Sequence, residues 1–347
     1  MSEMIQKLRA AQNLTDSELK TLLETDVYDE ELRLTADAVR REHYGTDVYI
    51  RGLIEFTNYC KNDCYYCGIR RSNRCAERYR LTKEEILECC EEGYALGFRT
   101  FVLQGGEDPY YTDDRICDIV SAIRGRYPDC AITLSIGEKS HDSYKSYFEA
   151  GANRYLLRHE TANAAHYSRL HPSELTFENR RKCLFDLKEI GFQVGAGFMV
   201  GSPFQTTETL IEDLRFLQEL SPDMIGIGPF LSHKDTPFCN FPNGELKLVL
   251  RLLGILRLLF PKVLLPATTA LGTMHPQGRE LGLRTGANVV MPNLSPKSVR
   301  EKYMLYDNKI STGEESAQSV RNLSAQVQAA GYRVVTARGD AKSYRKS

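Results

Sequence analysis

The feature that most restricts how this 347-residue chain can fold is a repeated alternation of short β-rich runs with amphipathic helical runs. The β-rich runs are residues 47–56, 99–106, 131–137, 153–160, 192–201, 223–230, 262–269 and 287–293. Helical runs lie between them, at 82–97, 143–151, 177–191, 206–220 and 278–286. Strands that alternate with helices predict a parallel sheet, because each parallel pair needs a crossover connection.

Eight such units predict an α/β fold of the (βα)8 barrel type (TIM-type), in which helices surround one closed sheet. Gly97, Gly151, Gly191 and Gly286 stand where helices are expected to end. The alternative is an open, doubly wound sheet. No G-x-G-x-x-G segment opens a helix after the first strand, so the dinucleotide-binding fingerprint of such a sheet is missing.

The barrel is expected to occupy residues 46–307, with an extension at each end. Residues 1–45 predict helices, one of which begins with a capping-box pattern from Thr15 to Glu18. Residues 308–347 are more polar and predict a helix and a short strand packed on the barrel. No flexible linker divides the chain, so we expect one domain with terminal extensions.

Charge and hydropathy exclude several classes of protein. The formal net charge is −1, and the chain has no basic stripe of the kind that binds nucleic acid. The N-terminal segment is amphipathic and lacks the apolar region of a signal peptide. The most apolar stretch, residues 246–267, contains Arg251, Arg257 and Lys262 and predicts a buried helix followed by a strand, with no membrane span. We therefore expect a cytoplasmic protein.

Ten cysteines in a cytoplasmic chain are not expected to form disulfides. Cys60, Cys64 and Cys67 have the spacing C-x3-C-x2-C and begin four residues after the first β-rich run. Loops that follow barrel strands form the active site of such folds, so the three thiols are expected at the mouth of the barrel. The other cysteines are scattered, and we predict that they are small core residues: Cys75, Cys89, Cys90, Cys117, Cys130, Cys183 and Cys239.

Three kinds of site are compatible with the clustered thiols. A structural zinc ion needs four closed ligands, so Cys75 or a histidine would have to supply the fourth. A catalytic thiol needs one cysteine and a nearby base, which leaves two thiols without a role. A cubane of four irons held by three cysteines leaves one iron open, as chemistry at a cluster requires. A [4Fe–4S] cluster is therefore the favoured interpretation.

The motif, with the aromatic Tyr66 before its last cysteine, resembles the signature of the radical S-adenosylmethionine (SAM) superfamily. The resemblance implies that the open iron chelates the amino and carboxylate groups of SAM. It also implies that the reduced cluster cleaves SAM and releases a 5′-deoxyadenosyl radical. The protein then has to hold the sulfonium near the cluster and the substrate near C5′.

Other segments match the superfamily pattern. Gly105, Gly106 and Glu107 resemble its GGE segment, which meets the amino group of the SAM methionine; a tight turn is the alternative for these residues. Arg158 and Glu160 alternate along LLRHETAN, so both are expected to point into the barrel, as ligand contacts or as a structural ion pair. The resemblance adds further residues that bind SAM: Tyr66, Ser135, Glu160 and Arg180.

The resemblance extends to the family of HydE, a maturase of [FeFe]-hydrogenase. It is carried by YCKNDCYYCGIRRSN, LQGGEDPYY, RYLLRHETAN, GIGPFLSHKDTPF, PATTALGT and GANVVMPNLSP, between about residue 45 and residue 306. Biotin synthase and methylornithine synthase look similar over parts of this pattern, and AERYRLT resembles a segment of the latter. The resemblance implies action with SAM on a small iron–cysteine complex that bears carbon monoxide and cyanide and is delivered by the partner maturase HydG. The product leads toward the diiron subcluster of the hydrogenase.

The resemblance also implies which residues surround the substrate. Residues that match inward positions of the family's anion-binding barrel are Arg154, Arg158, Thr268, Thr269, Met224 and Met291, and Tyr303 and Tyr306 match tyrosines that close the cavity. Arginine and hydroxyl donors suit an anionic complex, whereas methionines alone would be interpreted as core filling. By alternation, Thr268 and Thr269 can aim only one side chain inward.

The chain departs from the family near its C-terminus. Some members carry further cysteines there that hold a second cluster, but no cysteine follows Cys239. We therefore expect a single cluster, which argues against biotin synthase because that enzyme needs a second, sacrificial cluster. Two alternatives stay open: another enzyme of this branch, such as a relative of methylornithine synthase, and a non-catalytic scaffold that carries a cluster or zinc. We expect a monomer that works with other hydrogenase maturases and binds neither nucleic acid nor a membrane.

Overall fold

A computed structural model of the protein describes residues 2–310 and 317–344. Its centre is a six-stranded parallel sheet with the order β2-β3-β4-β5-β6-β8. These strands are β2 (Gly52–Thr57), β3 (Thr100–Gly105), β4 (Ala131–Ser135), β5 (Arg154–Leu156), β6 (Gln193–Ala196) and β8 (Met224–Ile225). Each strand lies beside the strand that precedes it in the chain, as expected for repeated β-α-β connections.

Further parallel pairings close this sheet into a barrel. Isolated bridges join Met224 to Leu264, Pro266 to Val289 and Leu53 to Asn293. In addition, β10 (Val289–Val290) pairs with β1 (Asp47–Ile50), which is separated from β2 by a single residue. All the predicted β-rich segments follow one another around this ring, so the predicted α/β barrel is confirmed. Two short strands, β7 (Met199–Val200) and β9 (Gly228–Pro229), pair with each other and extend the fifth and sixth segments.

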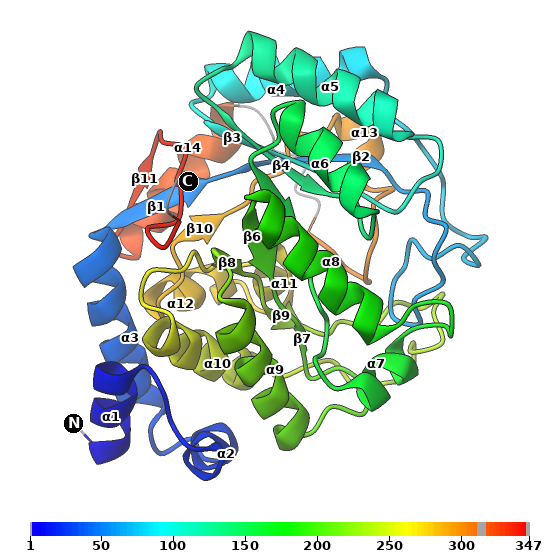
Figure 1. The fold of residues 1–347 in the computed structure, drawn as a ribbon. Helices are drawn as coiled ribbons and strands as arrows, with labels where there is room; N and C mark the ends of the chain where they lie inside the picture. Colours follow the sequence, from blue (N-terminus) through cyan, green and yellow to red (C-terminus); the bar gives the residue numbers. More distant parts are fainter. Residues whose placement is uncertain (1, 311–316, 345–347) are drawn as a thin grey trace.

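Helices form the outer layer around the strands (Figure 1). Those between residues 83 and 300 are α4 (Lys83–Ala95), α5 (Asp113–Arg126), α6 (His141–Glu149), α7 (Ala164–Leu170), α8 (Phe177–Ile190), α9 (Thr207–Leu220), α10 (Leu246–Leu259), α11 (Thr269–Met274), α12 (Gly278–Arg284) and α13 (Lys297–Arg300). Thr82 forms a capping box with Glu85 at the start of α4. The glycines predicted to end helices all have positive φ: Gly97, Gly151, Gly191 and Gly286.

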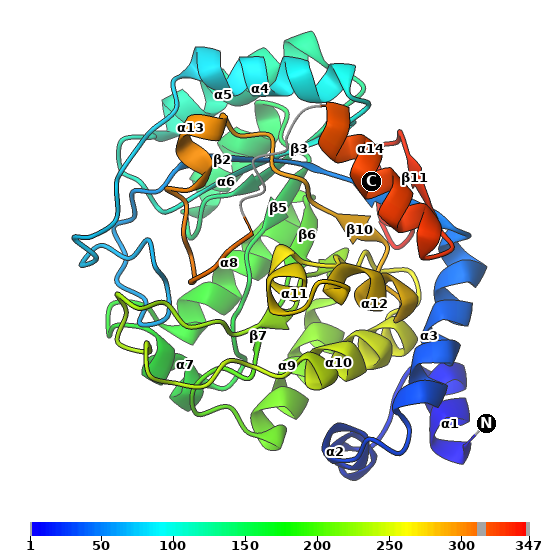
Figure 2. The same ribbon diagram turned by 180° about the vertical axis from the view of Figure 1, so that it is seen from behind.

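Three N-terminal helices and the C-terminal segment pack against the barrel. The helices are α1 (Glu3–Ala11), α2 (Asp16–Glu24) and α3 (Asp29–Tyr44), and the predicted capping box at Thr15 is present. The C-terminal segment contains α14 (Ala317–Ala329) and β11 (Arg333–Val335), so the helix and strand predicted there are also present. Figure 2 shows this segment beside β1, with which β11 pairs in parallel. Residues 1, 311–316 and 345–347 of the predicted extensions lie outside the described residues.

The apolar core extends from the barrel to its helices, and the apolar stretch at α10 is a buried helix, as predicted. Among the described residues, no helix has the length and apolar character needed to cross a membrane. Cys89, Cys90, Cys130 and Cys183 are buried as predicted, and Cys117 is half-buried. The core prediction is wrong for two scattered cysteines, Cys75 and Cys239, which are exposed because they lie on surface loops rather than on a packed helix face.

Candidate functional site

Cys60, Cys64 and Cys67 lie in the long loop between β2 and α4, at the carboxyl end of a barrel strand. The guanidinium of Arg78 holds this loop together, because it donates hydrogen bonds to the carbonyl oxygens of Ile69 (2.9 Å) and Asn73 (3.0 Å). A second contact joins Arg70 to Asp63 at 2.7 Å. The Arg78 bonds satisfy backbone carbonyl oxygens that regular structure would otherwise satisfy, and the Arg70–Asp63 ion pair joins two side chains of the loop, so the loop keeps a defined conformation.

Beside this loop lies a cavity of about 310 Å³ at the mouth of the barrel. It is lined by the three clustered cysteines and by every residue predicted to bind SAM. The latter are Tyr66, Gly105, Gly106, Glu107, Ser135, Glu160 and Arg180. They come from segments far apart in the chain and meet here because the carboxyl ends of parallel barrel strands form one rim.

The three cysteines are half-buried and lie beside one another at the cavity. Burial raises the pKa of the Cys64 thiol well above its ordinary value, and the neighbouring Cys67 and Cys60 raise it further. Burial also raises the pKa of Cys67 to about 12. Among the described residues, no three His, Cys, Asp or Glu side chains converge closely enough to hold a single metal ion. In a cubane each thiolate binds a different iron, and iron supplies the charge that lets such thiols ionise, so this donor set fits a cluster.

The GGE segment packs directly on the cysteine loop. A Cβ atom at Gly106 would lie 2.2 Å from the carbonyl oxygen of Tyr59 and 2.7 Å from the Cβ atom of Cys60. The backbone N–H of Lys61 donates to the carbonyl oxygen of Glu107 at 2.9 Å. Any side chain at Gly106 would therefore push the first cysteine out of position.

The carboxylate of Glu107 turns toward the end of β4. One of its oxygens accepts a hydrogen bond from the Glu138 N–H at 2.9 Å. The other is buried without a hydrogen-bond partner among the described residues, and the Lys61 ammonium lies 3.2 Å from it. Gly137 makes room for this carboxylate, because a Cβ atom there would lie 2.1 Å from the Glu107 side chain. Glu107 thus keeps acceptor capacity for an ammonium group.

His171 contacts Tyr66 through a hydrogen bond and through ring packing. The Tyr66 hydroxyl lies 3.1 Å from His171 Nε2, and the two rings meet edge to face at 5.4 Å. His171 Nδ1 lies 3.0 Å from the carbonyl oxygen of Tyr167, so Nδ1 carries the proton and Nε2 accepts from Tyr66. Burial lowers the pKa of His171 to about 3, which keeps the ring neutral and Nε2 available as an acceptor.

Arg158 and Glu160 both face the cavity, and the residue between them points away. Arg158 Nη2 lies 3.0 Å from Glu160 Oε2. Arg158 Nε is buried and has no hydrogen-bond partner within the described part of the chain. The ion pair therefore leaves donor capacity for a ligand. Glu160 has φ +63°, a left-handed conformation that is costly for a residue other than glycine.

Arg180 reaches the cavity from α8. Its Nε lies 2.5 Å from Glu138 Oε1, and its Nη1 donates to the carbonyl oxygen of Arg158 at 2.5 Å. Asn179 donates to the other Glu138 oxygen. Since both partners of this ion pair are buried, the guanidinium is held in one orientation and joins the ends of β4 and β5.

A further part of the wall consists of residues predicted to contact the substrate: Arg158, Thr268, Tyr303 and Tyr306. Thr268 Oγ1 is buried and has no hydrogen-bond partner among the described residues. The carbonyl oxygen of Leu305 accepts from the Gly68 N–H at 2.9 Å, so the segment with both tyrosines is attached to the cysteine loop. Buried polar atoms normally make hydrogen bonds, so the unpartnered ones on this wall are suited to a polar ligand.

The structure does not bring the other predicted substrate residues to this cavity. Thr269 begins α11, where its carbonyl oxygen accepts from the Thr273 hydroxyl. Met291 packs in an apolar cluster with Met224, Leu264 and Val289. Of the two adjacent threonines, only Thr268 lines the cavity, as the alternation rule predicts.

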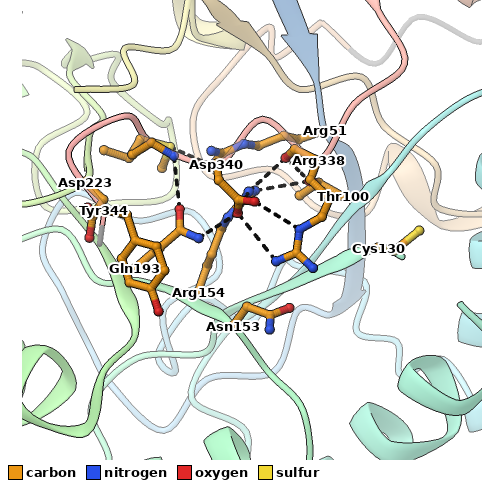
Figure 3. A network of polar contacts seen from close by, with 12 residues as sticks. Arg51, Thr100, Cys130, Asn153, Arg154, Gln193, Asp223, Arg338, Asp340 and Tyr344 are labelled. Atoms are coloured by element: carbon orange, nitrogen blue, oxygen red, sulfur yellow. Dashed lines mark hydrogen bonds and ion pairs between the residues drawn. The ribbon is translucent and has the colours of Figure 1, made fainter. Parts of the chain in front are cut away.

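Arg154 does not line the cavity; it lies at the start of β5, in a polar network with Arg338 and Asp340 (Figure 3). Its Nη2 lies 2.8 Å from Asp340 Oδ1 and 2.8 Å from the carbonyl oxygen of Arg338. Arg154 begins β5, whereas Arg158 follows the carboxyl end of that strand. The expectation that both arginines surround the substrate therefore needs correction: alternation places them on the same face of the strand but does not give their height in the barrel.

Three residues that support this site were not predicted from the sequence: Gly137, Glu138 and His171. The first two had a signal, because SIGE follows a barrel strand in the same way as the GGE segment does. His171 had none, since its contact with Tyr66 spans 105 residues of chain.

Comparison with known proteins agrees with this geometry. The model of the Radical SAM superfamily matches residues 54–217. The [FeFe] hydrogenase maturase subunit HydE of Thermotoga maritima is 49% identical over 288 residues, which cover 83% of this chain and 82% of that protein.

Methylornithine synthases are also similar. The 3-methylornithine synthase of Methanosarcina barkeri is 32% identical over 311 residues, which cover 88% of this chain and 87% of that protein. The crystal structure of methylornithine synthase (PylB) matches with a TM-score of 0.85 at 30% identity and covers 96% of this chain and 97% of that chain. These likenesses extend over the barrel and most of its extensions.

Proposed function

This chain belongs to the HydE family of the radical SAM superfamily, and from that premise we propose that it acts as a maturase in assembly of the diiron subcluster of [FeFe]-hydrogenase. It is a radical SAM enzyme, and the cofactors of its family are a [4Fe–4S] cluster and SAM. The observation that carries the proposal is one cavity in which three thiols and the predicted SAM contacts face a wall of polar groups.

In this proposal, Cys60, Cys64 and Cys67 hold the cluster. Bound together, the cluster and SAM supply a 5′-deoxyadenosyl radical by one-electron cleavage of SAM. The side chains of the protein orient SAM at the cluster. Glu107 offers a buried carboxylate oxygen to the SAM ammonium, and Glu160 and Arg180, with Tyr66, Gly105, Gly106 and Ser135, complete the SAM contacts.

The substrate side of the cavity suits an anion. We propose that Arg158, Thr268, Tyr303 and Tyr306 bind a small iron–cysteine complex that bears carbon monoxide and cyanide. The support is chemical: Arg158 Nε and Thr268 Oγ1 are buried without hydrogen-bond partners in the described part of the chain, and an anionic complex accepts from both. We further propose that the chain works as a monomer, receives this complex from the HydG maturase and acts with the other hydrogenase maturases.

An anaerobic maturation assay tests the function. Apo-[FeFe]-hydrogenase is mixed with the partner maturases, SAM and a reductant, and hydrogen evolution is measured with this protein, without it and with Cys64→Ala. Cys75→Ser is the matched control, because Cys75 is exposed and does not line the cavity. We expect hydrogen evolution with the wild type and the control variant only.

A second candidate is a methylornithine synthase-like mutase, which the 32% identity and the TM-score of 0.85 favour. If hydrogenase stays inactive while 5′-deoxyadenosine forms, the radical chemistry is right, the maturase proposal is overturned and the mutase becomes the leading candidate. If neither hydrogen nor 5′-deoxyadenosine forms with the reconstituted wild type, a scaffold role takes precedence. Iron analysis near four per chain, against one zinc, then separates a cluster carrier from a zinc protein.

A further inference from the structure

A buried histidine–aspartate pair lies behind the part of the cavity wall that carries Glu160, one of the predicted SAM contacts. His159 stands between Arg158 and Glu160 but turns away from the cavity, and Asp213 faces it from α9. Both side chains are 0% exposed, and His159 Nε2 lies 3.3 Å from Asp213 Oδ1. Burying two polar groups costs free energy that a well-packed apolar pair would avoid, so the pair needs a reason beyond packing.

The hydrogen bonds of the pair hold the chain on both sides of Glu160. The Gly197 N–H donates to His159 Nδ1 at 3.3 Å, so the ring proton is on Nε2 and faces Asp213. The same Asp213 oxygen accepts from the Ala162 N–H at 2.5 Å. Hydrogen bonds therefore fix His159 through Gly197 and Ala162 through Asp213, whereas His159 Nε2 and Asp213 Oδ1 meet in an electrostatic contact without a hydrogen bond to Nε2 in the described part of the chain.

Glu160 is the residue that needs such support. Its φ of +63° is in the left-handed region, and such conformations persist in residues other than glycine only where the surroundings over-determine them. Its N–H donates to the carbonyl oxygen of Gly197 at 3.1 Å, and its own carbonyl oxygen accepts from the Met199 N–H at 3.4 Å. The His159 ring also packs against Phe216, with ring centroids 4.9 Å apart, so the anchor itself is well fixed.

We propose that His159 and Asp213 are a positioning pair that holds Glu160 in the geometry that binds SAM, with Arg158 beside it on the substrate side of the cavity. The inference rests on the proposed function, because that function supplies the ligand of these side chains. Neither member of the pair touches the cavity. Both act through the backbone of Glu160, whose strained conformation aims its carboxylate at the ligand.

Binding of S-adenosylhomocysteine, an unreactive analogue of SAM, tests the pair without turnover. Reconstituted protein is titrated anaerobically by calorimetry, and its iron content is measured in parallel. His159→Phe keeps an aromatic ring but removes both nitrogens, and Asp213→Ala removes the acceptor. We expect the Kd to rise about tenfold for each, as for outer-shell partners of other bound groups. Asp213→Asn keeps the accepting oxygen and is expected to bind nearly as well as wild type.

Two further variants separate positioning from stability. Leu214→Ala creates a cavity at the adjacent, fully buried position of α9, and we expect a lower Tm with unchanged affinity. The double variant His159→Phe/Asp213→Leu replaces the polar pair with an apolar one, so it is expected to fold, yet to bind S-adenosylhomocysteine as weakly as the single variants.

Three results would overturn the proposal. The first is wild-type affinity in the double variant or in both single variants. The second is an equal loss of affinity in Leu214→Ala. The third is a wild-type protein, loaded with its cluster, that does not bind S-adenosylhomocysteine. That last result removes the proposed function together with the pair, whereas the first two remove the pair alone.

Discussion

The ammonium group of Lys309 and the carboxylate of Glu55 form an ion pair buried within the fold, although 254 residues separate them in the chain. Asn293 Nδ2 donates to the other Glu55 oxygen at 2.8 Å. Lys309 Nζ also donates to the carbonyl oxygen of Tyr303 at 2.9 Å. The pair therefore attaches the segment that carries Tyr303 and Tyr306 to strand β2. That segment forms one side of the cavity.

Removal of the cation alone is expected to destabilise the protein strongly. Lys309→Met leaves the Glu55 carboxylate buried without its partner, which lowers the free energy of unfolding by about 3–5 kcal/mol. Denaturant unfolding of the purified chain measures this loss. In the double variant Glu55→Gln/Lys309→Met no charge is left behind, so most of the stability should return. Lys182→Met, which removes an exposed ammonium group paired with the half-buried Asp186, is the control and should change the free energy by less than about 1 kcal/mol. A wild-type transition for Lys309→Met would show that the ion pair contributes nothing.

Gly137→Ala is expected to impair SAM binding. The residue has φ +79°, so alanine there costs roughly 1–2 kcal/mol of stability. Its methyl group would also meet the Glu107 side chain and displace the carboxylate that we assign to the SAM ammonium. We expect the Kd for S-adenosylhomocysteine to rise at least about tenfold, which corresponds to ~1.4 kcal/mol. Gly125→Ala is the control, because a Cβ atom there meets nothing within 4 Å. Equal affinities in the two variants would contradict the role given to Glu107.

His171 is expected to make the folded state acid-sensitive. Its pKa is lowered by burial to about 3, whereas a histidine in the unfolded chain has its ordinary pKa of 6.5. The stability that the neutral ring contributes is complete above pH 6.5 and is lost as pH falls from there toward 3, because only the unfolded chain binds the proton. Between pH 7 and pH 5 this loss amounts to about 2 kcal/mol.

Urea unfolding of the metal-free chain at pH 7 and pH 5 measures this effect. His171→Phe keeps a ring against Tyr167 but cannot titrate, so its stability should fall less over the same interval. Burial also lowers the pKa values of His159 and His166. The wild type and His171→Phe both contain these two histidines, so their effect on the pH dependence of stability cancels in the comparison. Identical pH dependence in wild type and variant would argue against a neutral His171.

Asp340 is expected to matter for stability but not for binding. It accepts hydrogen bonds from Arg154 Nη2 at 2.8 Å and from Gln193 Nε2 at 2.7 Å (Figure 3). This network lies at the start of β5 and does not line the cavity. Asp340→Ala leaves the buried guanidinium without its carboxylate and should lower the free energy of unfolding by about 2 kcal/mol. Asp340→Asn keeps the hydrogen-bonding oxygen and should lose less. Affinity for S-adenosylhomocysteine should stay the same in both, and a tenfold loss would place Arg154 back among the ligand contacts.

Local patterns in the chain were sufficient for the fold and for the centre of the site. Strand runs alternating with helical runs led to the barrel, and cysteines spaced C-x3-C-x2-C after the first run led to its mouth. The interpretation of Gly106 and Glu107 followed from the resemblance of their segment, at the end of a strand, to the GGE segment of the superfamily. These inferences held because spacing, periodicity and position after a strand are local properties, which backbone geometry converts directly into direction and face.

Other features depended on the tertiary structure. Arg154 and Arg158 have the same alternation, but one stands at the start of β5 and the other beyond its carboxyl end, so one lies against Asp340 and the other in the cavity. The contact of Tyr66 with His171 and the ion pair of Glu55 with Lys309 join segments with no common pattern. The sequence by itself determined that the three cysteines and the GGE segment lie at the mouth of the barrel. Which side chains hold them in place was decided only when distant segments packed together, because long-range contacts depend on the closure of the whole barrel rather than on any local preference.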